Sequence, residues 1–165
     1  MKKILILIAV FILANLPLKA QNYSDFSISD LSDNDVTLSK LLEKGPVLIS
    51  FWASWCEPCK EEMRLTNMIY EKYKDKGFTL LAVNEDNQKS LSKVKAYIEA
   101  KGYNFVVGLD TDRKVYEAYW GNQDLQLPFS VIINKNKEIV SKHAGFLPGD
   151  ETKIEEEVLS ALNTK

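Results

Sequence analysis

The sequence predicts an α/β fold in which a mixed β-sheet is covered by helices on both faces. Three observations support this prediction. Apolar segments typical of strands alternate with segments of helical spacing along most of the chain. The strands expected over 47–52 and 78–83 are almost continuously apolar, as in strands buried on both faces. Near the end, two short strands flank an Asn134–Lys137 turn and precede a last helix, which adds an antiparallel hairpin to the sheet.

The elements follow in order from an entry arm over 21–45, which holds a short strand near 26–28 and a short helix over 37–42. A central strand over 47–52 leads into a long helix over 57–76, which Gly77 ends. The remaining elements are a strand over 78–83, a helix over 90–101, a strand over 103–109, a helix over 112–120, hairpin strands over 129–133 and 138–141, and a closing helix over 152–162.

Residues 1–20 have the pattern of a secretory signal peptide. Two lysines follow Met1, residues 4–14 form an apolar stretch, and the small residue Ala20 precedes Gln21. Eleven apolar residues are fewer than a membrane-spanning helix needs, so we expect cleavage after Ala20. The alternative is an uncleaved anchor, and only then would the chain be attached to a membrane. The expected organisation is a signal peptide over 1–20 and one domain over 21–165, located in the periplasm or cell envelope.

The charge of the mature chain argues against a nucleic-acid partner. Residues 1–20 contain three lysines and no acidic residue, so their removal changes the formal net charge from −2 to −5. No cluster of basic residues is present, whereas nucleic-acid-binding domains carry one. An apolar content of 45 % is enough for the core of a single globular domain.

The only two cysteines lie in Trp55-Cys56-Glu57-Pro58-Cys59, between the central strand and the long helix. The unpaired N–H groups and the dipole of a helix N-terminus stabilise a thiolate there. A structural disulfide would close a very small loop and would stabilise the fold little. The pair therefore predicts thiol–disulfide exchange, in which Cys56 attacks a substrate disulfide and Cys59 resolves the mixed disulfide. Trp55 would shield the Cys56 sulfur on one side.

Two segments carry a resemblance to a known family. Residues 51–60, with the sequence FWASWCEPCK, resemble the active-site signature of the thioredoxin superfamily. Residues 127–133 resemble its second landmark, a cis-proline loop that leads into a strand. The helix and strand expected over about 90–108, the export signal and residues 109–113 are similar to the TlpA/ResA-like branch. The resemblance covers about residues 25–163 and implies a thioredoxin-like mixed sheet with an inserted helix–strand unit.

The resemblance also implies how the loop around Pro128 acts. A cis peptide bond before Pro128 would face the cysteines and leave the backbone of Leu127 free to pair with a substrate chain. Without the resemblance, Pro128 would be expected to be a trans proline that begins a strand. Phe129 stands where many relatives have threonine, so we expect it to make the floor of the substrate groove bulkier and more apolar.

Glu62 is the third residue to which we assign a catalytic role. It lies three positions after Cys59, so the two share a helix face, and its carboxylate could accept the proton that Cys59 must lose. ResA-like proteins have a glutamate at the matching position. Thioredoxins proper carry a buried aspartate in the preceding strand, where this chain has Ser50. The alternative is an ordinary solvated acid on the helix surface beside Lys60 and Glu61.

The leading hypothesis is a thiol–disulfide oxidoreductase, without cofactor or metal, that reduces protein disulfides in the cell envelope. Glu57 disfavours the thiolate of its neighbour Cys56, which favours a reductant. A reductant in an oxidising compartment implies a transmembrane thiol electron donor as a partner. Cysteines at the haem sites of apocytochrome c, in a role in cytochrome c maturation, and other exported proteins remain open as substrates.

Two other functions agree less well with the sequence than the leading hypothesis. A thiol peroxidase shares this architecture but needs Pro and Thr shortly before a single cysteine, and residues 51–55 lack both. A non-catalytic docking module would be expected to lose one of the two cysteines. His143 is the only histidine and lies far from the cysteines in sequence, so we expect no zinc site. Residues 84–86 are expected to be a plain loop after a strand.

Overall fold

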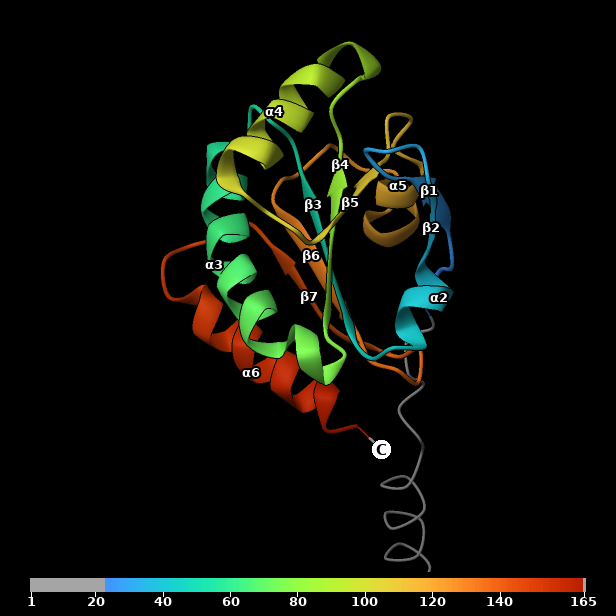
Figure 1. The fold of residues 1–165 in the computed structure, drawn as a ribbon. Helices are drawn as coiled ribbons and strands as arrows, with labels where there is room; N and C mark the ends of the chain where they lie inside the picture. The colour runs from blue at the N-terminus through green and yellow to red at the C-terminus, as the bar shows by residue number, and fades with distance from the viewer. Residues whose placement is uncertain (1–22, 165) are drawn as a thin grey trace, which may run out of the picture.

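A five-stranded mixed sheet forms the centre of the fold in the computed structural model, which describes residues 23–164 (Figure 1). Its strand order is β5-β4-β3-β6-β7. The neighbouring strands β5, β4 and β3 are parallel, whereas β6 pairs antiparallel with both β3 and β7. The strands are β3 (Val47–Trp52), β4 (Thr79–Asn84), β5 (Val106–Leu109), β6 (Phe129–Ile133) and β7 (Ile139–Ala144). The predicted mixed sheet flanked by helices is confirmed.

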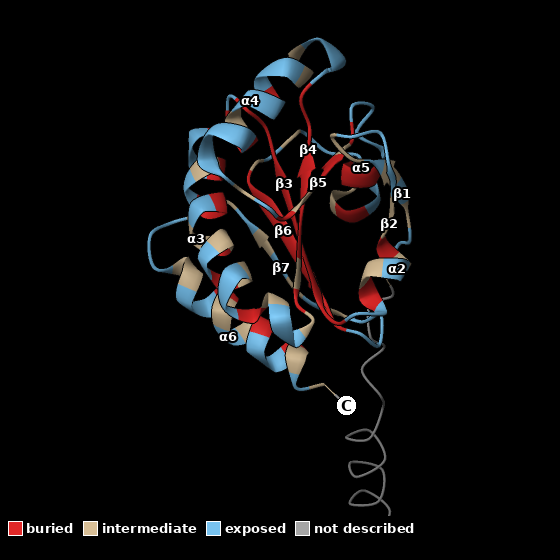
Figure 2. Ribbon diagram, in the orientation of Figure 1, coloured by how far each residue is buried: buried red, intermediate tan, exposed pale blue. Residues whose placement is uncertain are grey.

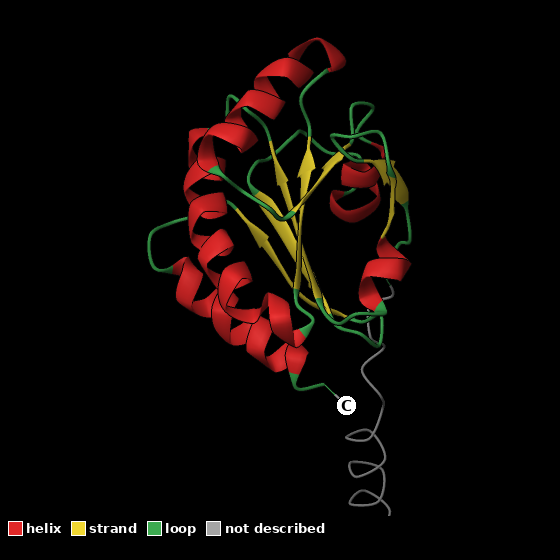
Figure 3. Ribbon diagram, viewed as in Figure 1, coloured by secondary structure: helices red, strands yellow, loops and turns green. Residues whose placement is uncertain are grey.

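Helices cover both faces of this sheet, as the colours of Figure 3 show. One face packs under α3 (Glu57–Tyr73), α4 (Leu91–Lys101) and α6 (Asp150–Leu162). The other packs under α2 (Leu38–Leu42) and α5 (Lys114–Trp120) and beside the ribbon of β1 (Ser27–Ser29) and β2 (Asp35–Thr37). Two short 3-10 turns, η1 (Lys74–Lys76) and η2 (Gln88–Ser90), complete the elements.

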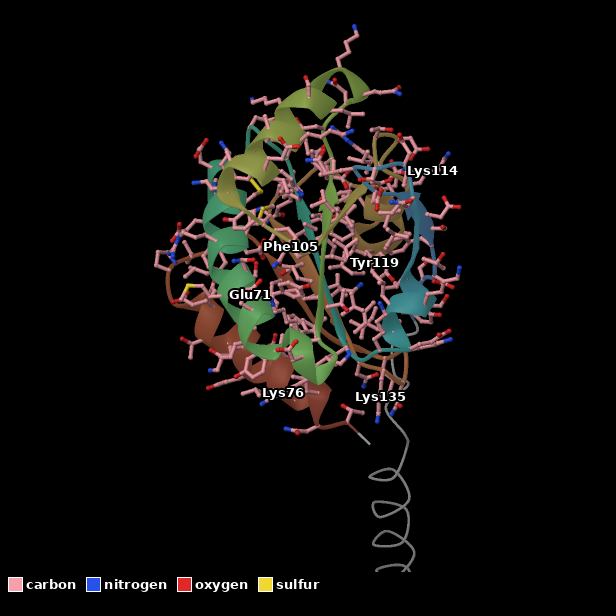
Figure 4. The ribbon with its side chains drawn as sticks, viewed as in Figure 1. Glu71, Lys76, Phe105, Lys114, Tyr119 and Lys135 are labelled. Atoms are coloured by element: carbon pink, nitrogen blue, oxygen red, sulfur yellow. A yellow bond between two sulfur atoms is a disulfide. The ribbon has the colours of Figure 1, made fainter. Side chains whose placement is uncertain are left out.

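Side chains of β3 alternate between two apolar clusters, one on each face. Leu48 and Trp52 belong to the cluster under α3 and α6, whereas Ile49 and Phe51 belong to the cluster under α2 and α5. All six residues of β3 are buried, and Figure 2 shows the centre of the sheet as the most buried part of the fold. The packed side chains are drawn in Figure 4. Burial on both faces explains why the sequence of this strand is apolar throughout.

Several boundaries differ from the sequence prediction. The strand expected near 26–28 is present as β1, but its partner β2 was not predicted, because the residues of β2 are only partly buried and carry a weak pattern. The long helix ends at Tyr73, with the expected last turn present as η1, and β5 begins at Val106 instead of residue 103. The second hairpin strand runs on to Ala144 because β7 stays paired with β6 as far as Phe129.

Gly77 ends η1, which is the last turn of the long helix predicted from the sequence. Its φ of 93° is in the left-handed region, which favours glycine. A Cβ atom there would also clash with the backbone oxygen of Lys44. Both constraints fix glycine where η1 turns into β4.

The predicted signal peptide over residues 1–20 lies outside the described residues. Within residues 23–164, no helix is long and apolar enough to cross a membrane.

Candidate active site

Cys56 and Cys59 are joined by a disulfide where β3 gives way to α3, with their Cα atoms 5.3 Å apart. Cys56 is the N-cap residue of α3, and its sulfur accepts a hydrogen bond from the backbone N–H of Cys59 at 3.3 Å. Pro58 lies in the first turn, where its missing N–H removes no helical hydrogen bond. The Cys56 residue is 6 % exposed and Cys59 is fully buried. Of the two sulfurs, Cys56 is therefore the one that a substrate can reach.

Trp55 lies on the surface next to this disulfide. It is 58 % exposed, which is unusual for a tryptophan, and it directly precedes Cys56. An exposed aromatic side chain beside a reactive sulfur offers apolar contact area to a bound chain.

The peptide bond between Leu127 and Pro128 is cis, as the resemblance implied. Leu127 packs against both apolar clusters, one of which contains both cysteines. The pairing of β6 with β3 begins only at Phe129, which leaves Leu127 outside the sheet.

Phe129 does not form the floor of a substrate groove, and this prediction was wrong. Its side chain is buried and stacks on Phe51 with the ring centroids 5.4 Å apart. Both rings belong to the cluster under α2 and α5, on the face of the sheet opposite the cysteines. Successive side chains of a strand point to opposite faces, so it is Ser130 that faces the cysteine side.

Glu62 is buried inside the protein, which excludes the alternative of a solvated surface acid. Only 1 % of it is exposed, and it shares the inner face of α3 with Cys59. The hydroxyl of Ser50 donates a hydrogen bond of 2.8 Å to its Oε2 atom. Ser50 thus contacts the carboxyl group directly, from the strand position where thioredoxins carry an aspartate.

Burial raises the pKa of Glu62 to about 7, because the ionised carboxylate loses its hydration. The hydroxyls of Ser50 and Ser130, which are opposite each other in the β3–β6 register, act against this rise. The charge of Asp150 adds a smaller upward contribution. A carboxyl group with this pKa exchanges its proton readily near neutral pH.

A second buried carboxylate, that of Asp86, holds the segment in front of Cys56. It accepts hydrogen bonds from the backbone N–H of Ser54 at 2.6 Å and from the Ser54 hydroxyl at 2.8 Å. The side-chain amide of Asn84 donates a third bond to it at 2.9 Å. Residues 84–86 are thus a structured, buried support for the cysteine loop, and the prediction of a plain loop was incomplete.

The order of the elements could have indicated that residues 84–86 lie close to the cysteine loop. Residues that follow neighbouring parallel strands meet at one edge of a sheet, and both Cys56 and Asp86 follow such strands.

Glu85 and Asp110 form a buried pair of acids at the same edge. Burial next to Asp110 raises the pKa of Glu85 to about 9, and both oxygens of Glu85 lack a hydrogen bond of normal geometry. Asp110 accepts bonds from the backbone N–H groups of Val115 and Tyr116 and so supports the start of α5. The contacts of this pair support the fold, and both acids are distant in sequence from the two cysteines.

No group of three metal-ligating side chains occurs within residues 23–164. The Nε2 atom of His143 on β7 lies 2.6 Å from a carboxyl oxygen of Glu157 on α6, so this histidine links the sheet to the last helix.

Comparisons with known proteins agree with this geometry. The sequence model of the AhpC/TSA family matches residues 20–142. The fold resembles that of peroxidoxin BcpB from Mycobacterium tuberculosis, with a TM-score of 0.74 over 88 % of this chain and 97 % of that one. The two chains are only 16 % identical, so this likeness concerns the fold alone.

More similar proteins carry names from one reaction class. The chain is 33 % identical over 129 residues to the thiol-disulfide oxidoreductase ResA of Bacillus anthracis, covering 78 % of this chain and 69 % of that protein. It is 36 % identical over 122 residues to ResA of Bacillus subtilis, covering 73 % and 64 %. A putative thiol:disulfide interchange protein DsbE from Chlorobium tepidum superposes with a TM-score of 0.77 and 30 % identity, over 88 % of this chain and 98 % of that one. The chain therefore belongs to the AhpC/TSA family of the thioredoxin superfamily and is a ResA-like thiol-disulfide oxidoreductase.

Proposed function

We propose that this protein reduces disulfides of protein substrates in the cell envelope. The observation that carries the proposal is the unequal exposure of the two cysteines, with Cys56 6 % exposed at a helix N-terminus and Cys59 fully buried one turn later. The signal-peptide pattern of residues 1–20 supports the envelope location. The names of the ResA and DsbE relatives support exchange between thiols and disulfides.

The reaction takes place in two exchanges. The Cys56 thiolate attacks one sulfur of the substrate disulfide, forms a mixed disulfide and releases the other substrate sulfur as a thiolate. The Cys59 thiolate then attacks the Cys56 sulfur, closes the Cys56–Cys59 disulfide and releases the second substrate sulfur. Two electrons pass from the dithiol to the substrate, so a thiol donor must reduce the protein again. In the envelope, that donor is expected to be a transmembrane protein.

Glu62 is proposed as the base in the second exchange. Cys59 is fully buried, so its proton needs an acceptor within the protein, and Glu62 lies on the same inner helix face. Its pKa of about 7 leaves a useful fraction of carboxylate at neutral pH.

Substrate contact is proposed for Trp55, Leu127 and Pro128. Trp55 presents an exposed ring on one side of Cys56. The cis peptide at Pro128 follows Leu127, whose backbone lies outside the β3–β6 pairing and can form strand-like hydrogen bonds with an extended substrate.

The proposal is tested with the reduced protein and a Cys59→Ala variant. In the wild type, Cys56 should be alkylated faster than Cys59 at neutral pH, because it is the more exposed and lies at the helix start. Cys59→Ala should accumulate long-lived mixed disulfides with a protein disulfide substrate such as insulin, since no second sulfur resolves them. The matched control is Cys56→Ala, which should trap no substrate.

Two results would contradict the proposal. Faster alkylation of Cys59 would reverse the assigned roles. A reactive Cys56 that traps no substrate in Cys59→Ala would favour a docking module, and rapid reduction of a hydroperoxide with no reduction of insulin would favour a thiol peroxidase.

A further inference from the structure

We propose that Asp86 is a positioning residue for Cys56 and that its buried negative charge keeps the Cys56–Cys59 couple reducing. This inference deepens the proposed function, because it assigns the direction of electron flow to a residue outside the cysteine motif. It rests on the geometry of the cysteine loop and on the charges around Cys56.

The contacts of Asp86 fix the chain immediately before the nucleophile. Both of its oxygens accept hydrogen bonds from Ser54, one from the backbone N–H and one from the hydroxyl. Ser54 lies two residues before Cys56, which limits their separation to about 7 Å along the chain. Two further bonds end on the Trp52 carbonyl, from the Glu85 backbone N–H at 2.9 Å and from the Asn84 amide at 3.5 Å. The end of β4 and the two residues after it therefore hold the cysteine loop at Trp52 and at Ser54.

The side chain of Asp86 accepts every hydrogen bond that it makes. Each of its side-chain hydrogen bonds comes from a donor, namely two from Ser54 and one from Asn84. Asp86 is only 3 % exposed, and none of the described basic side chains forms an ion pair with it. A charge this deeply buried is screened by solvent and salt much less than a charge on the surface.

Asp86 outweighs the acid that is next to Cys56 in sequence. The Glu57 side chain is 79 % exposed and pairs with Lys60 at 2.5 Å, so solvent and a counter-charge reduce its influence. Glu85 is neutral near pH 7, because burial raises its pKa to about 9. Burial likewise raises the pKa of Tyr97, which packs against the same cluster from α4, to about 12, so that it is also neutral.

Glu62, on the same inner helix face as Cys59, is only partly ionised near neutral pH, and Asp150, whose charge acts on Glu62, is partly exposed at the start of α6. Among these acids, Asp86 is the one that is both buried and hydrogen-bonded to the segment just before Cys56. Such a charge opposes the helix N-terminus and disfavours the thiolate. Because the thiolate is present only in the reduced form, a charge that destabilises it makes the dithiol a better electron donor.

Asp86→Asn tests this inference, and Glu85→Gln is the matched control. Asp86→Asn removes a charge, whereas Glu85→Gln replaces a group that is already neutral at pH 7. We expect Asp86→Asn to lower the pKa of the Cys56 thiol by about one unit, measured from the pH dependence of its alkylation between pH 6 and 8. The thiolate fraction below this pKa would rise about tenfold. Glu85→Gln should leave this profile unchanged.

The reduction potential provides a second readout, which a purely structural role would not produce. Asp86→Asn should become more oxidising by an amount that grows from pH 6 to pH 8, since only the thiolate responds to the charge. Asp86→Glu keeps the charge and should return both the thiol pKa and the potential towards the wild type. If Asp86→Asn does not fold, Asp86→Ser supplies a smaller neutral acceptor for Ser54 and carries the same prediction.

Three results would overturn the inference: a neutral variant with the wild-type thiol pKa and potential, a shift equal to that of Glu85→Gln, or an Asp86→Glu variant that behaves like Asp86→Asn. Both measurements use the protein without a substrate. Failure of the wild type to reduce protein disulfides would therefore refute the proposed function and leave this inference standing.

Discussion

Two buried glutamates, Glu62 and Glu85, have the same side chain and nearly the same burial, at 1 % and 4 % exposed, but different surroundings. The carboxyl group of Glu62 receives a hydrogen bond from Ser50 and lies beside Ser130. Glu85 has no such donor, and the neighbouring Asp110 repels its charge. The pKa values are raised to about 7 and about 9, respectively.

The comparison shows that burial alone does not set the pKa of a carboxyl group. Desolvation raises the pKa of both acids, but for Glu62 the hydrogen bond from Ser50, with the Ser130 hydroxyl nearby, limits the rise to about 7. Glu85 keeps its proton and has no part in the proposed exchange. The hydroxyl groups of β3 and β6 therefore separate a proposed catalytic acid from a structural one.

The largest effect is expected for Glu62→Gln. This change removes the proton acceptor but keeps the size of the side chain, so resolution of the mixed disulfide should slow by roughly 10²- to 10⁴-fold. The first attack by Cys56 should be nearly unchanged. Rapid mixing with a chromogenic disulfide between pH 5 and 8 separates the two steps, with Cys59→Ala used to time the first attack alone.

Glu85→Gln is the control that could break the comparison. It should resolve the mixed disulfide at the wild-type rate. Equal resolution rates in Glu62→Gln and the wild type would remove Glu62 from the mechanism, and an equally slow Glu85→Gln would show that burial, not position, sets the effect.

The second effect concerns stability and is expected for Glu85. In the unfolded chain Glu85 loses its proton above its ordinary pKa of 4.5, but in the folded protein it does so only near 9. The folded state therefore binds more protons, and its contribution to the free energy of unfolding falls as the pH rises from 4.5 to 9. Relative to the wild type, Glu85→Gln should gain roughly 2–3 kcal/mol between pH 4.5 and pH 7.

Urea unfolding at several pH values measures this difference. A constant difference between the two proteins across this range would show that Glu85 ionises normally in the folded state. That result would remove the contrast with Glu62.

The smallest effect is expected for Ser50→Ala, which sharpens the comparison. Loss of the 2.8 Å hydrogen bond removes a group that stabilises the ionised form, so the pKa of Glu62 should rise further. The pH midpoint of resolution should move up by about one unit, which lowers the rate about tenfold at pH 6. Ser50→Thr should restore the midpoint.

Ser141→Ala is the matched control for this change. Ser141 is a serine of β7 whose hydroxyl donates to Glu157 instead of Glu62, so its removal should leave the midpoint in place. An unchanged midpoint in Ser50→Ala would show that the hydroxyl does not set the acidity of Glu62.

Much of the fold was predictable from local patterns in the sequence. The apolar run of β3, the helical spacing of α3 and the turn between β6 and β7 each depend on residues close together in the chain. The strand and helix around Cys56 are of this kind, so the position of the cysteine pair at a helix start could be predicted.

The cis peptide at Pro128 came from the resemblance, and the structure confirms it. The sequence predicted a short strand close to β1, but β2 was missed because it is only three residues long and carries a weak pattern.

What the sequence by itself determined was the alternation of elements, the reactive pair of cysteines and the helix face that Glu62 shares with Cys59. Only the tertiary structure decided the pKa values of the buried carboxyl groups and the residues to which they are hydrogen-bonded. Ser50 and Glu62 are 12 positions apart, and Ser54 and Asp86 are 32 apart. The first hydrogen bond forms only when α3 packs on β3, and the second only when β3 pairs with β4. Burial and hydrogen-bond donors set the charge of a carboxyl group, and both are supplied by residues distant in the chain.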